Sequence, residues 1–139
     1  MESTEKQINI VTSFSETILK DTAIHLLNST KENLDTSINF TAYHHDCKIE
    51  AYSLPDYTYK NLHDVKDHED FLKRYAEHDG TEEGKIPYNE KLDALKWSHK
   101  VFALTEMAFD LAEKSKNPGW LIWIDADSYL KKRLTKQDM

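Results

Sequence analysis

The chain has 139 residues, enough for one hydrophobic core, and its 39% hydrophobic and 31% charged side chains are ordinary for a folded domain. With 25 acidic against 18 basic side chains the net charge is −7, which excludes bulk attraction to nucleic acid or anionic membranes. Cys47 is the only cysteine, so an intrachain disulfide is excluded. No apolar run approaches the roughly 20 residues of a membrane span, and the polar N-terminus is unlike a signal peptide. We therefore expect a single domain, residues 1–139, in the cytoplasm.

The first part of the sequence predicts one strand followed by one helix. Residues 8–11 are apolar and β-branched, which predicts a strand that ends near Thr12. Residues 13–16, Ser-Phe-Ser-Glu, match the capping box that begins many helices, and the helical pattern continues to about Lys31. The face expected to be buried consists of Leu19, Ala23, Leu26, Leu27 and Thr30.

Two further strands and a charged helix are expected in the middle of the chain. Residues 37–43 are rich in β-forming side chains, and residues 48–52 alternate apolar and polar side chains, so both segments predict strands. Residues 64–77 predict a highly charged helix with a thin apolar stripe at Phe71, Leu72 and Tyr75.

The last part of the sequence predicts the longest helix and a buried strand. Residues 90–115 carry one face with many small side chains and a second apolar stripe, so this helix is expected to lie buried between layers. The first face comprises Ala94, Ser98, Val101, Phe102, Thr105, Ala108, Phe109 and Ala112, and the second Leu95, Leu104 and Leu111. Residues 120–124 are apolar at every position, which is typical of a central strand covered on both faces.

The order of these elements, β-α-β-β-α-α-β, predicts an α/β fold with a Rossmann-like sheet, mixed or parallel, and helices on both faces. Ligands of such folds bind outside the carboxyl ends of the strands, near the point where the strand order reverses. Three segments follow predicted strand ends and are therefore candidates for a site: residues 12–15, 43–46 and 125–128.

The most informative of these segments is Asp125-Ala126-Asp127, which directly follows the apolar strand. In extended backbone, residues i and i+2 point the same way, so both carboxylates could converge on one hard cation such as Mg²⁺ or Mn²⁺. Two converging carboxylates without a cation would repel each other, which favours the metal. The alternative is a solvated junction in which the aspartates serve as turn formers.

Two segments carry a resemblance to a known family. Residues 96–104, followed by residues 120–128 with the D-x-D motif, resemble the core of GT-A-type glycosyltransferases, and more narrowly glycosyltransferase-like proteins of bacteria and bacteriophages. Residues 10–15 are similar to the first strand and nucleotide-contacting turn of these enzymes. The resemblance runs in order along nearly the whole chain.

The resemblance implies that the protein binds a nucleotide-sugar, or a nucleoside diphosphate of the UDP type, with the metal held by Asp125 and Asp127 bridging the diphosphate. It implies a fold equivalent to the nucleotide-binding half of a GT-A domain. The side chains implied to cradle base and ribose are Thr12, Ser13, Phe14, Ser15, His44 and His45.

The family normally continues beyond the motif with the half that binds the acceptor and supplies any catalytic base. Only residues 128–139 follow the motif here, so we expect a chain without that half, with unknown catalytic residues and with sugar transfer left open. Another metal-dependent phosphotransfer fold, such as a Toprim-like domain, would need an acidic residue at the end of the first strand. Glu16 fills that role poorly because it lies inside the capping box.

Two side chains of the long helix have open interpretations. Lys100 could reach a phosphate if this part of the helix lies near the strand edge, or it could be one more solvated lysine. Trp97 could be either packing or a platform for a ligand.

The histidines give weaker signals. Residues 44–47, His-His-Asp-Cys, form a poor zinc site because neighbours on a strand point to opposite faces and no second cluster has zinc spacing. His63 with Asp67, and Asp64 with His68, are spaced i,i+4 and predict ordinary pairs on a helix surface.

A non-catalytic interaction module is the alternative to a nucleotide-binding protein. A sheet that stops after residues 120–124 would leave apolar surface and a strand edge open. Either residues 130–139 fold back over the gap or a second copy covers it, and we expect the homodimer.

Overall fold

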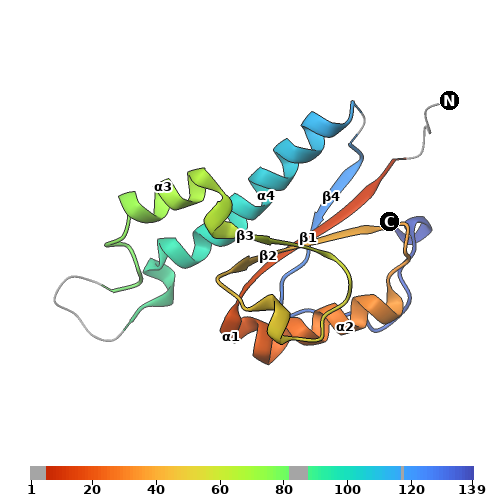
Figure 1. Ribbon diagram of the computed structural model, residues 1–139, viewed down its shortest axis with the longest axis horizontal. Coiled ribbons are helices and arrows are strands. Elements are labelled where there is room, and N and C mark those ends of the chain that lie inside the picture. Colours follow the sequence, from red (N-terminus) through yellow and green to blue (C-terminus); the bar gives the residue numbers. More distant parts are fainter. Residues whose placement is uncertain (1–5, 82–87, 117) are drawn as a thin grey trace.

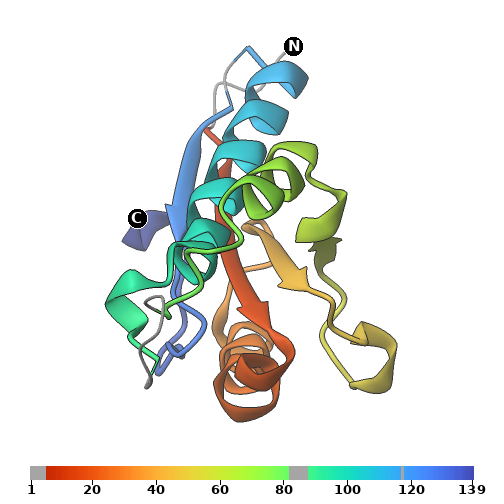
Figure 2. The same ribbon diagram turned by 90° about the vertical axis from the view of Figure 1, so that its left-hand side faces the viewer.

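The computed structural model describes residues 6–81, 88–116 and 118–139, which contain one four-stranded parallel sheet in the order β3-β2-β1-β4. Its strands are β1 (Ile8–Ser15), β2 (Asn39–His45), β3 (Thr58–Asn61) and β4 (Trp120–Trp123). Helices α1 and α2 lie on one face of the sheet and α3 and α4 on the other (Figures 1 and 2). The predicted Rossmann-like α/β class is confirmed, and the sheet is parallel rather than mixed.

Strand β1 extends to Ser15, beyond its predicted end near Thr12, so the predicted capping box at residues 13–16 does not form. It pairs with β2 from Asn9 opposite Asn39 to Ser15 opposite His45, so Ser13 is a strand residue and not a helix cap. The N-cap is Ser15, whose hydroxyl accepts a hydrogen bond of 3.4 Å from the Ile18 amide. Pairing with the full length of β2 supplies backbone partners that a helix beginning at Ser13 would lose.

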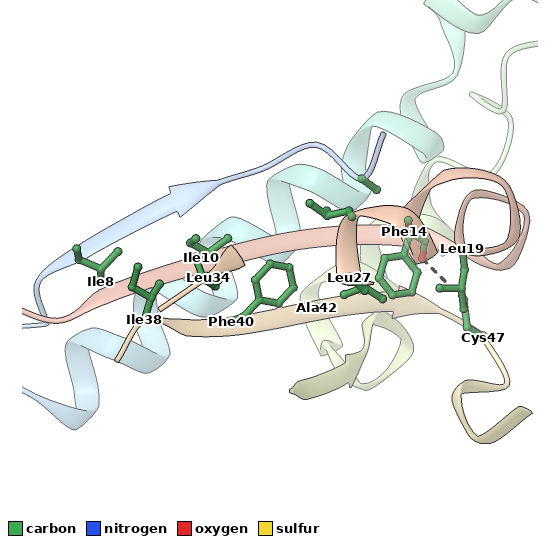
Figure 3. Close-up of a cluster of buried hydrophobic side chains, with 13 residues drawn as sticks. Ile8, Ile10, Phe14, Leu19, Leu27, Leu34, Ile38, Phe40, Ala42 and Cys47 are labelled. Carbon is green, nitrogen blue, oxygen red and sulfur yellow. Dashed lines mark hydrogen bonds between the residues drawn. The ribbon is translucent and has the colours of Figure 1, made fainter. Parts of the chain in front are cut away.

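The helical segment after β1 has the buried face that the sequence predicts. It comprises α1 (Glu16–Ile18), a π-helical turn (Leu19–Ala23) and α2 (Ile24–Asn33). The predicted side chains are all fully buried: Leu19, Ala23, Leu26, Leu27 and Thr30. Figure 3 shows part of this core, with side chains of the helix gathered against apolar side chains of β1 and β2.

The C-terminal segment covers the core on the α2 side. Leu130 and Leu134 pack against it, and the Leu130 amide donates a hydrogen bond of 2.9 Å to the Ser29 hydroxyl. Leu134 also forms a parallel bridge with Leu34, and the chain closes with a 3-10 turn at Lys136–Asp138. The fold-back of residues 130–139 is therefore present on this face of the sheet.

The predicted third strand at residues 48–52 is wrong. That segment contains a 3-10 turn at Ile49–Ala51, and the third strand is β3, which begins only at Thr58. A neighbouring parallel strand needs a crossover of roughly a dozen residues or more, so a strand starting directly after β2 could not have paired with it in parallel. The 3-10 turn Leu62–Asp64 follows β3.

Helix α3 (Lys66–Arg74) packs beside α4 (Ala94–Lys114), where Phe71 meets Phe102 with ring centroids 5.4 Å apart. A 3-10 turn, Glu90–Leu92, precedes α4.

The expectation that α4 is buried between layers is wrong, because only one side of α4 contacts the sheet. Its buried residues are Ser98, Ala103 and Met107, whereas Val101 is 58% and Phe109 66% exposed. No helix within the described ranges is long and apolar enough to cross a membrane.

Strand β4 is an edge strand, which contradicts the expected central position. Its one neighbour among the described strands is β1, in register from Ile8 opposite Trp120 to Val11 opposite Trp123. None of its residues is fully buried, and Trp120 is 61% exposed. An unbroken apolar run looks the same in sequence whether a partner strand lies on one side or on both.

Candidate functional site

The three segments that the sequence nominated lie on the side of the sheet where its parallel strands end, called the carboxyl edge below. All strands are parallel, so β1, β2 and β4 end at the same side, and the Ile124 amide donates to the Val11 carbonyl at 3.0 Å just beyond β4. From β1 the chain moves outward to β2 and β3, then returns to β4 on the opposite flank of β1. The strand order therefore reverses between β1 and β4, which is where this class of fold binds ligands.

At the end of β1, alternate side chains divide between the two faces. Phe14 belongs to the core on the α2 side, and Thr12 is fully buried with its hydroxyl lacking a hydrogen-bond partner among the described residues. A ligand would therefore meet these two residues through their backbone. Ser13 and Ser15 are partly exposed, and Ser15 already caps the following helix.

His44 and His45 point to opposite faces, as expected for neighbours on a strand. Nδ1 of His44 accepts a hydrogen bond of 3.1 Å from the Cys47 amide, and His45 stacks on His99 of α4 with ring centroids 4.6 Å apart. Burial raises the pKa of the Cys47 thiol to about 11, so Cys47 is a neutral core side chain and not a thiolate ligand.

The predicted surface pairs of His63 and His68 are wrong because α3 begins only at Lys66. His63 lies before the helix, with Nε2 2.7 Å from Asp46 Oδ2 and Nδ1 in contact with Glu69. His68 is fully buried, so it cannot form a surface pair. Sequence spacing could not identify these contacts, since they join three different elements.

Asp125 is held at the end of β4 by two side chains. The Trp123 indole donates a hydrogen bond of 2.6 Å to Asp125 Oδ1, and Lys100 Nζ lies 3.7 Å from the same oxygen. Lys100 Nζ also sits 5.0 Å from the centre of a Trp123 ring. Lys100 therefore lies near the end of β4, as it must if it is to reach a phosphate there.

Asp127 belongs to a turn, so the expectation that extended backbone would point both carboxylates the same way is wrong. The Ser128 amide donates to the Asp125 carbonyl at 3.0 Å, and this bond closes a turn around Ala126 and Asp127. Ala126 is buried in the α2-side core, while both aspartates are exposed. The two carboxylates thus flank a buried residue and remain accessible to solvent. In the described part of the chain, no three potential ligands are grouped to hold a metal, so a cation here would need oxygens from water or ligand.

Trp97 stands outside the core. It is 55% exposed, and its indole donates a hydrogen bond of 3.0 Å to the Glu90 carbonyl, which fixes the ring at the surface. The Lys96 Nζ lies over the ring, 6.0 Å from its centre, and Trp97 precedes Lys100 by about one helical turn.

A cavity of about 690 Å³ lies away from the carboxyl edge, where β2 and β3 begin and α4 ends. Three of its charged side chains contact each other: Asp110 lies 3.8 Å from Lys60 and 2.9 Å from Lys114. The contact of Asp110 with Lys60 joins α4 to β3.

Comparison of the chain with protein-family models, curated proteins and solved structures gives no match.

Proposed function

We propose that the protein binds a nucleotide-sugar, or the corresponding nucleoside diphosphate, through a Mg²⁺ or Mn²⁺ ion held by Asp125 and Asp127. The observation that carries the proposal is the meeting of Lys100 and Asp125 at the carboxyl end of β4, beside β1, where the strand order reverses. The resemblance of residues 96–104 and 120–128 to GT-A-type glycosyltransferases supports the same ligand class.

Electrostatics explains why a cation is needed. A diphosphate concentrates negative charge, and a protein with a net charge of −7 repels it. A divalent ion on Asp125 and Asp127 inverts the local sign, and Mg²⁺ is commonly held by one or two carboxylates together with phosphate oxygens and water. Lys100 then becomes available to the phosphate, since the ion replaces it as the partner of Asp125.

Calorimetry with UDP, in the presence and absence of Mn²⁺, tests this proposal. Binding is expected only with the metal. Replacing Asp125 or Asp127 by alanine should remove at least ~2 kcal/mol of Mn²⁺-linked affinity, because one carboxylate holds the cation poorly. Glu113→Ala, an exposed carboxylate near the other end of α4, is the matched control and should bind normally. Metal-independent binding, or full affinity in the Asp125→Ala/Asp127→Ala double variant, would rule out this site.

A second candidate function is that of a homodimeric interaction module, and the exposed face of α4 favours it. An apolar groove of about 550 Å³ runs between α4 and β4. It is lined by Leu104, Thr105, Ala108, Phe109, Ala112 and Leu121. Beside it, β4 has a neighbour on one side only among the described strands. Antiparallel pairing of β4 with its copy about a two-fold axis would continue the sheet and bring the two α4 faces together.

Light scattering behind size exclusion, at micromolar concentration, is expected to give the mass of two chains. Phe109→Glu should shift the mass to one chain, because it places a charge in the apolar groove. Tyr129→Glu changes another exposed aromatic side chain away from the groove and should leave the dimer intact. A single-chain mass for the unmodified protein, unchanged on dilution, would contradict the dimer.

A further inference from the structure

Four histidine side chains meet where α3 and the first half of α4 pack on the ends of β2 and β3. This histidine cluster consists of His45, His63, His68 and His99. The ring of His45 stacks on that of His99 at a centroid distance of 4.6 Å and contacts the tilted ring of His63 at 4.4 Å. His68 meets His99 at 5.2 Å and His45 at 6.2 Å. The cluster therefore joins two helices, one strand and one turn.

Among the described residues, one ring of the cluster has carboxylate partners. His63 lies between Asp46, 2.7 Å from Nε2 without the alignment of a hydrogen bond, and Glu69, in contact with Nδ1. Burial alone would lower the pKa of His63, but its hydrogen bond to Glu69 and the negative charge of Asp46 outweigh burial and raise that pKa. His63 is thus the ring that the fold stabilises in its charged form.

The other three rings are packed as neutral imidazoles. Nε2 of His45 is buried and has no hydrogen-bond partner among the described residues. His68 is fully buried, with Nδ1 3.3 Å from the Leu62 carbonyl and Nε2 3.4 Å from the Ser98 hydroxyl. The Ser98 hydroxyl donates its hydrogen to the Leu95 carbonyl at 2.6 Å, so it has none to give neutral His68, and both polar neighbours of this ring act as acceptors.

The pKa values follow this packing. Burial lowers the pKa of His45, His68 and His99, the last to about 4, and the neighbouring histidines lower each further. The acidic groups that oppose this effect are Asp46 from the end of β2, Glu69 from α3 and, for His99, Asp93 at the start of α4. These acidic groups offset only part of the lowering of the three pKa values.

We propose that the histidine cluster is an acid-operated latch, which holds α3 and the first half of α4 against the sheet while its rings are neutral and releases them when the rings are protonated. Two imidazolium rings stacked at these distances repel each other, and no described carboxylate pairs with His45, His68 or His99. Moving the helices away lets the rings reach water. The latch requires no nucleotide.

The direction of the pH effect follows from the proton balance. Between the ordinary histidine pKa of 6.5 and about 4, the value for His99, the released state binds more protons than the closed state. The stability that these three rings give the closed state is therefore complete above about pH 6.5 and declines as the pH falls through that window. His63 acts in the opposite sense, because its raised pKa stabilises the closed state below pH 6.5 and that contribution is lost as the pH rises through the raised value.

Hydrogen exchange on the full chain, at about pH 7.5 and about pH 5, tests the latch, with rates corrected for the intrinsic effect of pH. Protection in α3 and the first half of α4 should fall about tenfold or more at the lower pH, while α2, on the other face of the sheet, keeps its protection. Unchanged protection in α3 would overturn the proposal. Equal loss in α2 would also overturn it, because it would show that the whole domain unfolds.

Matched variants assign the effect to the cluster. His45→Phe and His99→Phe keep a flat ring in the stack but cannot take up a proton, so each should reduce the acid response of α3. His25→Phe and His78→Phe alter exposed histidines outside the cluster and should respond like the unmodified protein. Should a phenylalanine variant fail to fold, NMR titration of the unmodified protein decides: the cluster rings must titrate together with the loss of α3 protection, and titration without that loss would refute the latch.

Discussion

Replacing Gly119 by alanine is expected to lower the free energy of unfolding by roughly 2–5 kcal/mol. Gly119 has a φ of +82°, and a Cβ there would lie 2.0 Å from the Gln7 carbonyl oxygen and 2.7 Å from the Gln7 nitrogen. Both clashing atoms are backbone, and the Trp120 amide donates to the same carbonyl at 2.8 Å. Relief would require β4 to move away from the start of β1.

Gly80→Ala is the matched control for this prediction. Gly80 has a similar φ of +92°, but a Cβ there would first meet the ring of Tyr88, an exposed side chain that can turn aside by giving up its 2.6 Å hydrogen bond to Asp93. The nearest backbone atom, the Asn89 oxygen, would be 3.0 Å away. Urea denaturation of both variants therefore separates the backbone clash from the strain of a left-handed alanine, which costs roughly 1–2 kcal/mol. Equal losses at the two positions would mean that the contact of Gly119 with Gln7 contributes little.

Leu27→Ala is expected to cost roughly 2–5 kcal/mol of the free energy of unfolding. Leu27 is fully buried between α2 and the sheet, where Figure 3 places it among Phe14, Phe40 and Ala42. Its removal leaves a cavity that rigid strands on one side cannot fill. Ile18→Ala, at a position 39% exposed, is the control and should cost less than about 1 kcal/mol. Denaturant unfolding checks both, and a small loss at Leu27 would indicate that the helix can collapse onto the sheet.

The parts of the fold that local sequence determines were predictable. The buried face of the first helix follows from spacing alone, since apolar side chains such as Leu19, Ala23 and Leu26 recur at helical intervals. The position of β3 was not predictable, because it depends on the length of the crossover from β2. The placement of β4 at an edge depends on which strands assemble beside it, and nothing in residues 120–124 encodes that.

The candidate site, too, was predictable only in part from the sequence. The sequence could place Asp125 at a strand end because the apolar run before it is local. It could not show that Trp123 and Lys100 would hold that carboxylate, nor that a turn would follow it. The histidine cluster was missed because its members come from four elements with no regular spacing, so only the tertiary fold brings them together.

The π-helical turn Leu19–Ala23 gives the first helix an unusual tolerance to a change in length. The Ile24 amide donates to the Leu19 carbonyl five residues back, which corresponds to one residue more than an α-helical turn contains. Deleting one exposed residue of that turn, such as Lys20, is expected to restore ordinary α-helical bonding and to keep Leu26 and Leu27 facing the sheet. A deletion within α2 would instead rotate one part of the helix against the other by about 100°. A change in the length of this helix is therefore expected to be accommodated best at the π-helical turn, which α1 separates from the end of β1.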